Sequence, residues 1–456
     1  MHNEPPGSLL NRSRTLPGLD PFAVIGLYVV LVLLPLGLAA FQGLPSRSIS
    51  SELSSALVMV GFAMMLVQFL LSGRIRSLSG KIGIDMTMRF HQLAAWIVLA
   101  LILVHPLLFA VPRLTPNPAD ALTTLSLMFS SQRLRTGVVG WCLLIMLVPL
   151  AAFRERLRMS YEAWRLSHAL GAAAIAAFGL HHALRVGTYS TDVWLTVYWT
   201  ALTALALLSL VRVRLIEPVL QLRAPYHVVS NRRVAHRMWE VAVKPQIGKP
   251  LSFAAGQFVW LKFGRSPFNV TEHPFSISSA PTEPVCVRFT IRESGDFTNR
   301  ISTIAVGTRA YLDGPHGRFT LAGRDARKIV FIAGGVGFAP IFSMLRQLAA
   351  ERHPHAVRLI YGNRNEMQIL YAEEIETLKH ALDLEVHLVL SEPPASWSGS
   401  VGELSLEVIR VCLGPADPDA LYFVCGPPAM MNSVEHSLAE LGIQSRQVIF
   451  ERFRYE

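Results

Sequence analysis

Six long apolar stretches occupy the first half of the chain. They lie at residues 22–44, 53–72, 88–111, 136–153, 164–186 and 191–213. A helix needs about 20 consecutive, mostly apolar residues to cross the hydrocarbon core of a bilayer, and the stretches approach or reach that length. We therefore predict a six-helix transmembrane domain over residues 22–215, preceded by a short tail over residues 1–21.

A different pattern begins near residue 224. Over residues 224–322, short β-rich runs are broken by Gly, Pro and Asn, which is typical of a small antiparallel β-barrel. Over residues 326–456, apolar strands alternate with helices, which predicts a mostly parallel, Rossmann-like α/β domain. The predicted fold class is therefore multi-domain: a helical membrane bundle, a β-barrel and a nucleotide-binding α/β domain.

Composition agrees with a membrane protein, since 51% of the 456 residues are hydrophobic and only 16% are charged. The net charge of +10 alone would also suit a nucleic-acid-binding protein. Many Lys and Arg residues flank the apolar stretches, however, so we expect no nucleic-acid partner. Twelve of them fall on one side of the predicted membrane domain and five on the other. The positive-inside rule then predicts a multi-pass protein of the inner or plasma membrane, with both termini in the cytoplasm.

Four histidines lie near the ends of two predicted spans. His91 and His105 are 14 residues apart on the third span, and His168 and His181 are 13 apart on the fifth. At 1.5 Å per residue, each pair is separated by roughly 20 Å along its helix. Ionisable groups inside a membrane are costly and are usually functional. Imidazoles at two matched depths on two helices are what two stacked haems with histidine ligands require.

Helix geometry does not decide which histidine is the second ligand on the fifth span. With about 100° per residue, a spacing of 14 returns a side chain to nearly the same helix face, whereas 13 does not. His182 therefore fits an ideal helix better than His181 as the partner of His168 along the fifth span. A bend in the helix would allow His181 instead.

Two segments of the β-rich region contain candidate site residues, and the second suits an anionic ligand. Residues 273–279 read HPFSISS, and residues 292–298 read RESGDFT before a predicted short helix, NRISTIAV. A glycine turn that leads into a helix beside an arginine suits a pyrophosphate, because backbone N–H groups face the anion.

The α/β region has glycines after its first predicted strand. The strand KIVFIA is followed by GGVGFAP at residues 334–340 and then by a helix. Later strands end at YGNRN (361–365) and CGPPAM (425–430). Ligands of parallel sheets bind at the carboxyl ends of the strands, where glycines let phosphates approach the backbone, so we predict a nucleotide site here.

Seven motifs, taken in order, resemble a known family. They are HPFSISSAP, GDFT, DGPHGRF, AGGVGFAP, YGNR, CGPPAMM and a C-terminal ERF. They resemble the ferredoxin-NADP reductase fold as it occurs in NADPH oxidases and ferric reductases. The histidine pairs upstream resemble the six-helix transmembrane domain of those proteins. HPFS replaces the Arg-x-Tyr-Ser motif of soluble members, so the chain looks like a bacterial-type member of the membrane-bound branch.

The resemblance implies an FAD site. The flavin-binding segment is matched by His273, Pro274, Phe275 and Ser276. The Ser276 hydroxyl is thereby implied to bind the isoalloxazine ring and to have a catalytic role. The segment at the FAD pyrophosphate is matched by Arg292, Gly295, Asp296 and Thr298.

The resemblance also implies an NAD(P) site. The dinucleotide loop is matched by Gly334, Gly335, Gly337 and Pro340. Arg364 matches a position often near the adenosine phosphate. A bidentate contact from its guanidinium to the 2′-phosphate would favour NADPH, with NADH as the other possibility.

Three further residues are implied to lie at the nicotinamide. Cys425 and Gly426 match the segment beside that ring. Phe453 matches an aromatic residue that covers the flavin until nicotinamide displaces it, and Tyr455 is the competing choice. Cys425 and Phe453 are thus implied to join Ser276 as catalytic residues.

The family's function implies an electron path across the membrane. Electrons would pass from NADPH through FAD and two haem b groups to an acceptor on the outer face. The family's spacing of 13 favours His181 over His182 as the outer ligand. Oxidases of higher organisms carry a further histidine where this chain has Phe109, so ferric iron is the first expected acceptor. The alternatives are dioxygen, giving superoxide or peroxide, and a membrane or periplasmic redox partner that receives the electrons. The oligomeric state cannot be predicted from the sequence.

Overall fold

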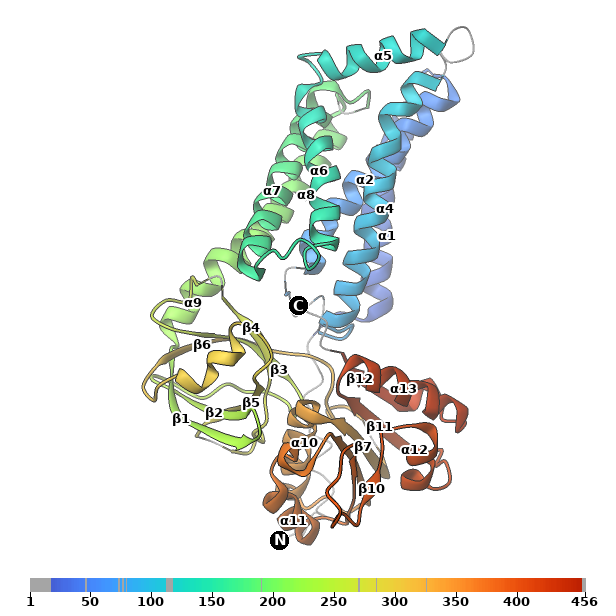
Figure 1. The fold of residues 1–456 in the computed structure, drawn as a ribbon. Helices are drawn as coiled ribbons and strands as arrows, with labels where there is room; N and C mark the ends of the chain where they lie inside the picture. Colours follow the sequence, from blue (N-terminus) through green and yellow to red (C-terminus); the bar gives the residue numbers. More distant parts are fainter. Residues whose placement is uncertain are drawn as a thin grey trace, which may run out of the picture. The chain divides into compact units, whose positions relative to one another are not determined.

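The computed structural model describes residues 18–45, 47–72, 74–75, 78, 80–111, 118–189, 191–269, 271–283, 285–324 and 326–452. The chain forms two compact units, and the boundary between them falls between Glu217 and Pro218 (Figure 1). Each unit has its own hydrophobic core.

The first unit is a bundle of long helices. Its spanning helices are α1 (Pro21–Phe41), α2 (Ile49–Ser72), α4 (Ile84–Ala110), α6 (Arg135–Ala152), α7 (Tyr161–Val186) and α8 (Val193–Val211). Within the described part of the chain, these are the six helices long and apolar enough to cross a membrane, as predicted. A π-helical turn over Arg212–Ile216 continues α8 into α9 (Glu217–Arg223). The short helix α5 (Pro118–Ser130) lies across one end of the bundle (Figure 1).

Some helices begin earlier than the apolar pattern indicates, because polar residues cap them. Helix α7 starts at Tyr161, since the Ser160 side chain accepts a hydrogen bond from the backbone N–H of Ala163. Helix α8 instead begins at Val193, two residues later than the apolar stretch, because the Asp192 carboxylate caps it by accepting from the backbone N–H groups of Trp194 and Leu195.

Close contacts between helices hold the bundle together. Helices α2 and α4 approach at Gly61, where a Cβ atom would lie 3.1 Å from Ile102. The Ser54 hydroxyl donates to the carbonyl of His105 over 2.7 Å. Small residues and hydrogen bonds between helices are the usual basis of packing within a bilayer. Large apolar side chains such as Phe22 and Trp194 face outward, as a lipid environment allows.

The second unit begins with an antiparallel sheet. Its strands are β1 (Tyr226–Ala235), β2 (Met238–Pro245), β3 (Phe258–Phe263), β4 (His273–Ser276), β5 (Val287–Arg292) and β6 (Arg309–His316). Their spatial order is β4-β3-β6-β1-β2-β5. A single bridge from Ile277, just after β4, to Phe289 in β5 connects the two edges of the sheet. The sheet therefore curves back on itself around a core that includes Val228 and Leu261.

A parallel sheet with helices follows. Its strands are β7 (Lys328–Gly334), β8 (Val357–Asn363), β9 (Leu384–Leu390), β10 (Ser400–Val401), β11 (Ala420–Cys425) and β12 (Val448–Glu451). Its helices are α10 (Phe338–Ala350), α11 (Ala372–Ala381), α12 (Leu406–Leu413) and α13 (Pro428–Glu440). The order β10-β9-β8-β7-β11-β12 reverses direction between β7 and β11. Such a reversal creates a crevice at the carboxyl ends of the strands, where ligands bind.

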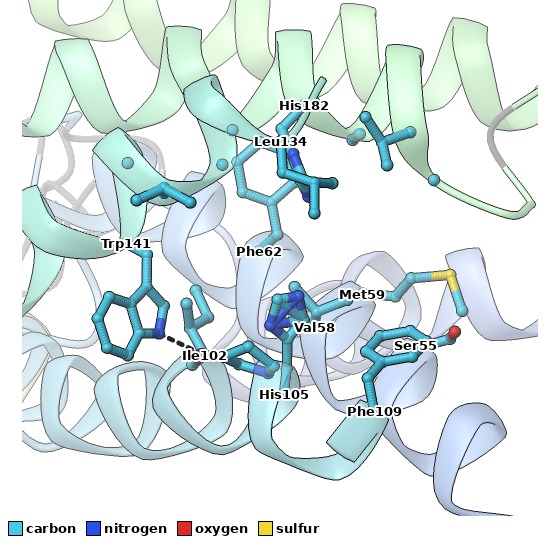
Figure 2. A pocket seen from close by; sticks show the side chains of 18 of the residues that line it. Ser55, Val58, Met59, Phe62, Ile102, His105, Phe109, Leu134, Trp141 and His182 are labelled. Carbon is cyan, nitrogen blue, oxygen red and sulfur yellow. Dashed lines mark hydrogen bonds between the residues drawn. The ribbon is translucent and has the colours of Figure 1, made fainter. Parts of the chain in front are cut away.

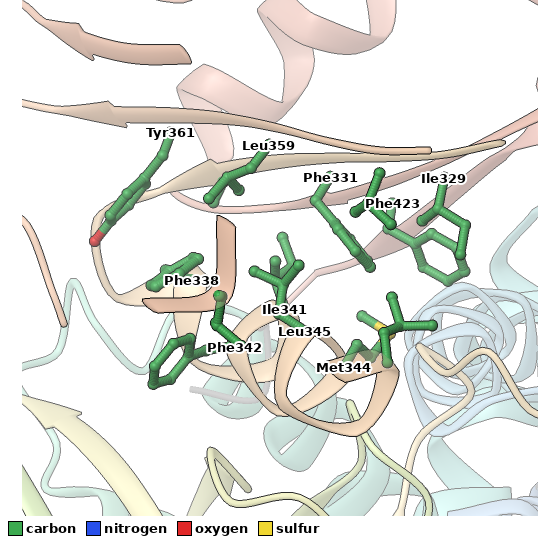
Figure 3. Close-up of a cluster of buried hydrophobic side chains, with 14 of the residues drawn as sticks. Ile329, Phe331, Phe338, Ile341, Phe342, Met344, Leu345, Leu359, Tyr361 and Phe423 are labelled. Carbon is green, nitrogen blue, oxygen red and sulfur yellow. The ribbon is translucent and has the colours of Figure 1, made fainter. Parts of the chain in front are cut away.

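A core of aromatic and aliphatic residues joins this sheet to α10. Figure 3 shows Phe331, Leu359 and Phe423 pointing from the strands toward Phe338 and Phe342 of the helix. All five side chains are fully buried. This packing holds the start of α10, and the glycine loop before it, against the end of β7.

A buried polar cluster connects the antiparallel sheet to the parallel one. The Tyr371 hydroxyl donates to the Glu240 carboxylate over 2.7 Å and shares a 2.8 Å hydrogen bond with Thr290. The guanidinium of Arg346 donates to the carbonyl of Ser278. Burial and the neighbouring Glu240 carboxylate raise the pKa of Tyr371, so its hydroxyl stays a donor at neutral pH. The two sheets of this unit are therefore joined by directional bonds as well as by apolar contact.

Candidate functional site

The first histidine pair lies between two membrane helices. His91 of α4 and His168 of α7 have ring centres 6.2 Å apart, and their ring planes are inclined at 76°. The Nδ1 atoms of both are buried and have no hydrogen-bond partner among the described residues. Two imidazoles that bind one metal ion from opposite sides, with metal–nitrogen distances of about 2 Å, have ring centres roughly 6 Å apart. The spacing therefore suits one metal ion between the rings.

Such an ion would need more ligands than the protein supplies. In the described ranges, no group of three or more His, Cys, Asp or Glu side chains could hold a metal ion. A haem needs only axial ligands from the protein, because its own ring nitrogens occupy the other positions. The donor set of His91 and His168 thus fits haem iron.

An aromatic and cationic stack borders this pair. The Trp164 ring lies 5.8 Å from the His168 ring, one helical turn earlier on α7. The guanidinium carbon of Arg154, in the connection between α6 and α7, lies 4.6 Å from the centre of the Trp164 ring. The stack fixes the end of α7 on which His168 sits.

The second pair faces a cavity of about 450 Å³. His105 of α4 and His182 of α7 lie on opposite sides of it, with Phe62, Ile102 and Trp141 among the other lining residues (Figure 2). The Nδ1 atoms of both histidines are buried and have no partner in the part of the chain that the structure describes. The volume lies within the usual range for a small-molecule or cofactor site, and the mostly apolar lining suits the macrocycle of a haem.

His182 faces this cavity and His181 does not. The His181 side chain is exposed, and its Nδ1 shares a 3.1 Å hydrogen bond with Thr136. His182 packs against Gly137 of α6, where a Cβ atom would lie only 2.3 Å from the His182 Nδ1. The preference for His181 that the family's spacing implied is therefore not supported by the geometry. The regular helix of α7 favours His182, the residue that ideal helix geometry indicated.

The segment matched to the flavin site forms β4. His273, Pro274, Phe275 and Ser276 pair with β3, and Ser276 lies opposite Phe258. Ser276 is buried, whereas the other three are partly exposed. The His273 ring stacks on Phe297 with centres 4.4 Å apart and an angle of 25°. Phe297 was not predicted as a site residue, although its place within the GDFT motif was the available signal.

The segment matched to the pyrophosphate follows β5. Arg292, Gly295 and Asp296 are exposed, and the Thr298 hydroxyl accepts a 2.9 Å hydrogen bond from the backbone N–H of Ser294. The predicted helix after it is a six-residue 3-10 helix over Thr298–Thr303. So short a helix has only a small dipole. The positive charge available to an anion here therefore comes from arginine side chains such as Arg292 rather than from the helix.

The glycine loop after β7 has two kinds of glycine. A Cβ atom at Gly334 would lie 2.2 Å from the Met430 sulfur, and one at Gly337 would lie 2.5 Å from the Cys425 carbonyl oxygen. These two glycines are needed for packing. Gly335 has φ +53°, and a Cβ atom there would meet nothing within 4 Å. Gly335 is thus where a phosphate can approach the backbone, and Pro340 lies just beyond it within α10.

The end of β11 forms the other side of this loop. Cys425 is fully buried beside Glu451 of β12, its partner in the strand register. Burial and the Glu451 carboxylate raise the pKa of the Cys425 thiol well above its ordinary value. A Cβ atom at Gly426 would lie 2.6 Å from the Met430 sulfur. Glu451 was not predicted, although a charged residue within the apolar run of the last strand was a usable signal.

Phe453 and Tyr455, the two candidates for the aromatic residue over the flavin, lie outside the described residues. Arg364 follows β8, and its side chain is 66% exposed. Its Nε lies 2.8 Å from a carboxylate oxygen of Glu392, which follows β9. The sequence did not predict this partner.

Three family models match the chain in succession. They are the ferric reductase like transmembrane component over residues 57–179, an FAD-binding domain over residues 229–334 and an oxidoreductase NAD-binding domain over residues 331–436. The first covers residues of both histidine pairs except His181 and His182. The other two cover the glycine loop and the β4 segment.

Individual relatives match part of the chain. NADH-cytochrome b5 reductase 1 of Candida albicans is 32% identical over 160 residues, which are 34% of this chain and 54% of the relative. The reductase component of propane 2-monooxygenase from Rhodococcus jostii is 30% identical over 213 residues, 44% of this chain and 55% of that protein. The chain thus spans about half the length of each of these curated relatives.

Two solved structures resemble the fold. The cytochrome b5 reductase domain of Ulva prolifera nitrate reductase has a TM-score of 0.45 and 19% identity, covering 50% of this chain and 96% of that one. Flavohemoglobin from Malassezia yamatoensis, with bound FAD and haem, has a TM-score of 0.48 and 16% identity, covering 89% and 98%. The three family models in this order describe a membrane protein in which a ferric-reductase-like transmembrane domain is fused to FAD-binding and NAD-binding domains, an arrangement that matches a ferric reductase/NADPH oxidase-like family.

Proposed function

We propose that the chain is a transmembrane reductase that takes electrons from NAD(P)H in the cytoplasm and delivers them to ferric iron or a ferric chelate on the outer face. The observation that carries the proposal is the 6.2 Å spacing between the rings of His91 and His168. A second pair, His105 and His182, lines one cavity between the same two helices. The direction is supported by the loop charges, from which the positive-inside rule predicts that both termini lie in the cytoplasm.

Four histidines would hold two haem b groups. His91 and His168 would bind one, and His105 and His182 the other. Fourteen residues separate the two levels on each helix, so the levels lie about 21 Å apart along the axes. Neutral imidazoles are good axial ligands for haem iron.

The second unit would hold FAD and NAD(P)H. The β4 segment and Arg292 would bind the flavin, and Gly335 would receive a phosphate of the dinucleotide at its backbone. When bound, NAD(P)H would supply a hydride to FAD, and FAD would supply single electrons to haem. Cys425 stays protonated at neutral pH, because burial raises its thiol pKa, so its role is to bound the nicotinamide pocket rather than to exchange protons.

Positive charge near the outer cavity supports an anionic acceptor such as ferric citrate. Arg47 donates hydrogen bonds to Ser55 and Thr188, which both line the cavity, but its charge is paired with the Glu52 carboxylate at 3.0 Å. The supporting charge is therefore that of two arginines near α6. Arg133 and Arg135 lie just before and at the start of α6, on the side of the bundle that we propose to be outside. Cationic groups at a cavity attract anions and raise their local concentration.

The test is reduction of ferric citrate by the purified full-length protein, with NADH or NADPH as donor. We expect about two haems and one FAD per chain, a reduced-haem spectrum on addition of the donor, and iron reduction that superoxide dismutase does not affect. Inhibition by the dismutase would show that dioxygen is the acceptor. A protein that binds no haem would overturn the proposal.

A further inference from the structure

Arg364 and Glu392 form an ion pair at the carboxyl edge of the parallel sheet. The Nε of Arg364 lies 2.8 Å from the Glu392 carboxylate, and the two side chains are 66% and 58% exposed. The pair raises the pKa of Arg364 and lowers that of Glu392, so both groups are charged at neutral pH. The arginine that the sequence assigned to a 2′-phosphate thus already has an anionic neighbour.

The backbone determines this pairing. The register of β8 and β9 ends with Asn363 opposite Leu390. Two hydrogen bonds continue it, from the N–H of Ser391 to the carbonyl of Asn363 over 3.1 Å and from the N–H of Glu392 to the carbonyl of Arg364 over 2.7 Å. Glu392 is therefore held beside Arg364 by the sheet and not by the side chains alone.

The ion pair lies where the adenosine end of a bound dinucleotide is expected. Strand β7, the loop at Gly335, helix α10 and strand β8 form one βαβ unit. In such units the phosphates bind at the first loop, and the residue after the second strand contacts the ribose of the adenosine. An acidic residue there accepts a hydrogen bond from the 2′-hydroxyl of NADH, whereas an arginine accommodates the 2′-phosphate of NADPH.

We propose that Glu392, by pairing with Arg364, makes this site select NADH over NADPH; the proposal rests on the proposed function as an NAD(P)H reductase. A phosphate monoester carries a charge of about −1.5 to −2 at neutral pH, so a 2′-phosphate bound to Arg364 would lie close to a second anion. The ribose hydroxyls of NADH meet no such repulsion and find an acceptor in the carboxylate. Both side chains are exposed, so water screens the charges and the preference is moderate.

The test compares the full-length wild type with Glu392→Gln. Binding of NAD+ and NADP+ to the oxidised protein is measured by titration calorimetry, and flavin reduction by NADH and NADPH is followed under anaerobic conditions. We expect the wild type to bind NAD+ more tightly than NADP+. In Glu392→Gln the ratio should move toward NADP+ by about five- to tenfold, as expected when one exposed unit charge about 4 Å away is removed.

A matched control comes from the same two strands. Arg358 of β8 donates to Glu385 of β9 over 2.7 Å, near the amino ends of these strands. Glu385→Gln removes a similar ion pair between the same strands and should leave the NAD+ to NADP+ ratio unchanged. Arg364→Gln should weaken NADP+ binding more than NAD+ binding.

Three outcomes would overturn the selection by Glu392. They are an unchanged ratio of NAD+ to NADP+ affinity in Glu392→Gln, an equal shift of that ratio in Glu385→Gln, and a wild type that prefers NADP+. In those three cases intact flavin reduction would leave the reductase function standing. If neither dinucleotide bound nor reduced the flavin, the proposed function would fail, and this inference with it.

Discussion

The imidazole rings of His91 and His168 come from different membrane helices, and their centres lie 6.2 Å apart in nearly perpendicular planes. If one haem iron lies between them, either ligand is essential for that haem. We expect His168→Ala to retain about one haem per chain in place of two, measured from the absorbance of the pyridine haemochrome. Reduction of the flavin by NAD(P)H should persist, because it does not depend on this pair. A variant that keeps both haems would contradict the assignment.

Neighbouring histidines on α7 provide a test of the second pair. His182 faces the cavity together with His105, whereas His181 is exposed and bonds to Thr136. We expect His182→Ala to lose one haem and iron reduction, while His181→Ala keeps both. The two variants remove the same group one residue apart, so each is the control of the other. The opposite result would restore the assignment that the family's spacing implies.

Two substitutions in the glycine loop should have different effects, one on stability and the other on dinucleotide binding. Gly337→Ala places a Cβ atom 2.5 Å from the Cys425 carbonyl oxygen, so we expect a loss of about 1–3 kcal/mol in stability. Gly335 has a left-handed conformation with open space around it, and Asn tolerates that conformation better than other non-glycine residues. Gly335→Asn should therefore fold normally but bind dinucleotide more weakly. Thermal unfolding and nucleotide titration would check the two effects, and normal binding in Gly335→Asn would argue against a phosphate at this loop.

The Tyr371 hydroxyl makes two of the hydrogen bonds that join the two sheets of the second unit. Tyr371→Phe removes the donor to the buried Glu240 carboxylate and should lower stability by about 1–3 kcal/mol. Tyr311→Phe is the matched control, because its hydroxyl makes a single 3.1 Å hydrogen bond to the carbonyl of Arg265. We expect a smaller loss there. Equal midpoints of thermal unfolding for the two variants would show that the cluster adds nothing beyond one ordinary hydrogen bond.

Alkaline pH should destabilise the second unit. Burial raises the pKa values of Cys425, Tyr361 and Tyr371, so the folded chain keeps protons that the unfolded chain releases. Stability from these groups is complete below the thiol's ordinary pKa of about 8.5 and falls as pH rises through and beyond that value. Unfolding followed by tryptophan fluorescence from pH 7 to 11 would check this, with Cys425→Ala showing a shallower fall just above pH 8.5. Stability that rises with pH would refute the prediction.

The membrane helices and the order of the domains could be predicted because each depends on local patterns. Length and apolarity are enough to mark α1 and α8 as spans. Helix α5 was not predicted, since its 13 residues are too few to cross a bilayer and its pattern is weaker. That His182 and not His181 would face His105 could be deduced from the 14-residue spacing, because α7 is a regular helix; which of the two binds a haem stays a prediction.

Pairs formed between distant strands could not be predicted. Glu392 meets Arg364 only because β8 and β9 pair in a particular register, and Glu451 meets Cys425 for the same reason. A sequence alone does not reveal such registers when several strands have similar apolar patterns. The stacking of His273 on Phe297 likewise depends on a turn that brings the end of β5 back toward β4.

The close approach of the two loops at Gly334, Gly337 and Gly426 limits how this protein can diverge. Any side chain at Gly337 would meet the backbone of the facing loop, and one at Gly334 or Gly426 would meet Met430. Evolutionary drift at these positions is therefore restricted, even if the cosubstrate changes. Arg364 and Glu392, which follow β8 and β9, are exposed, so we expect substitutions there to leave the packing intact. Mutant libraries intended to change cosubstrate preference should vary residues there and leave the glycine loops intact.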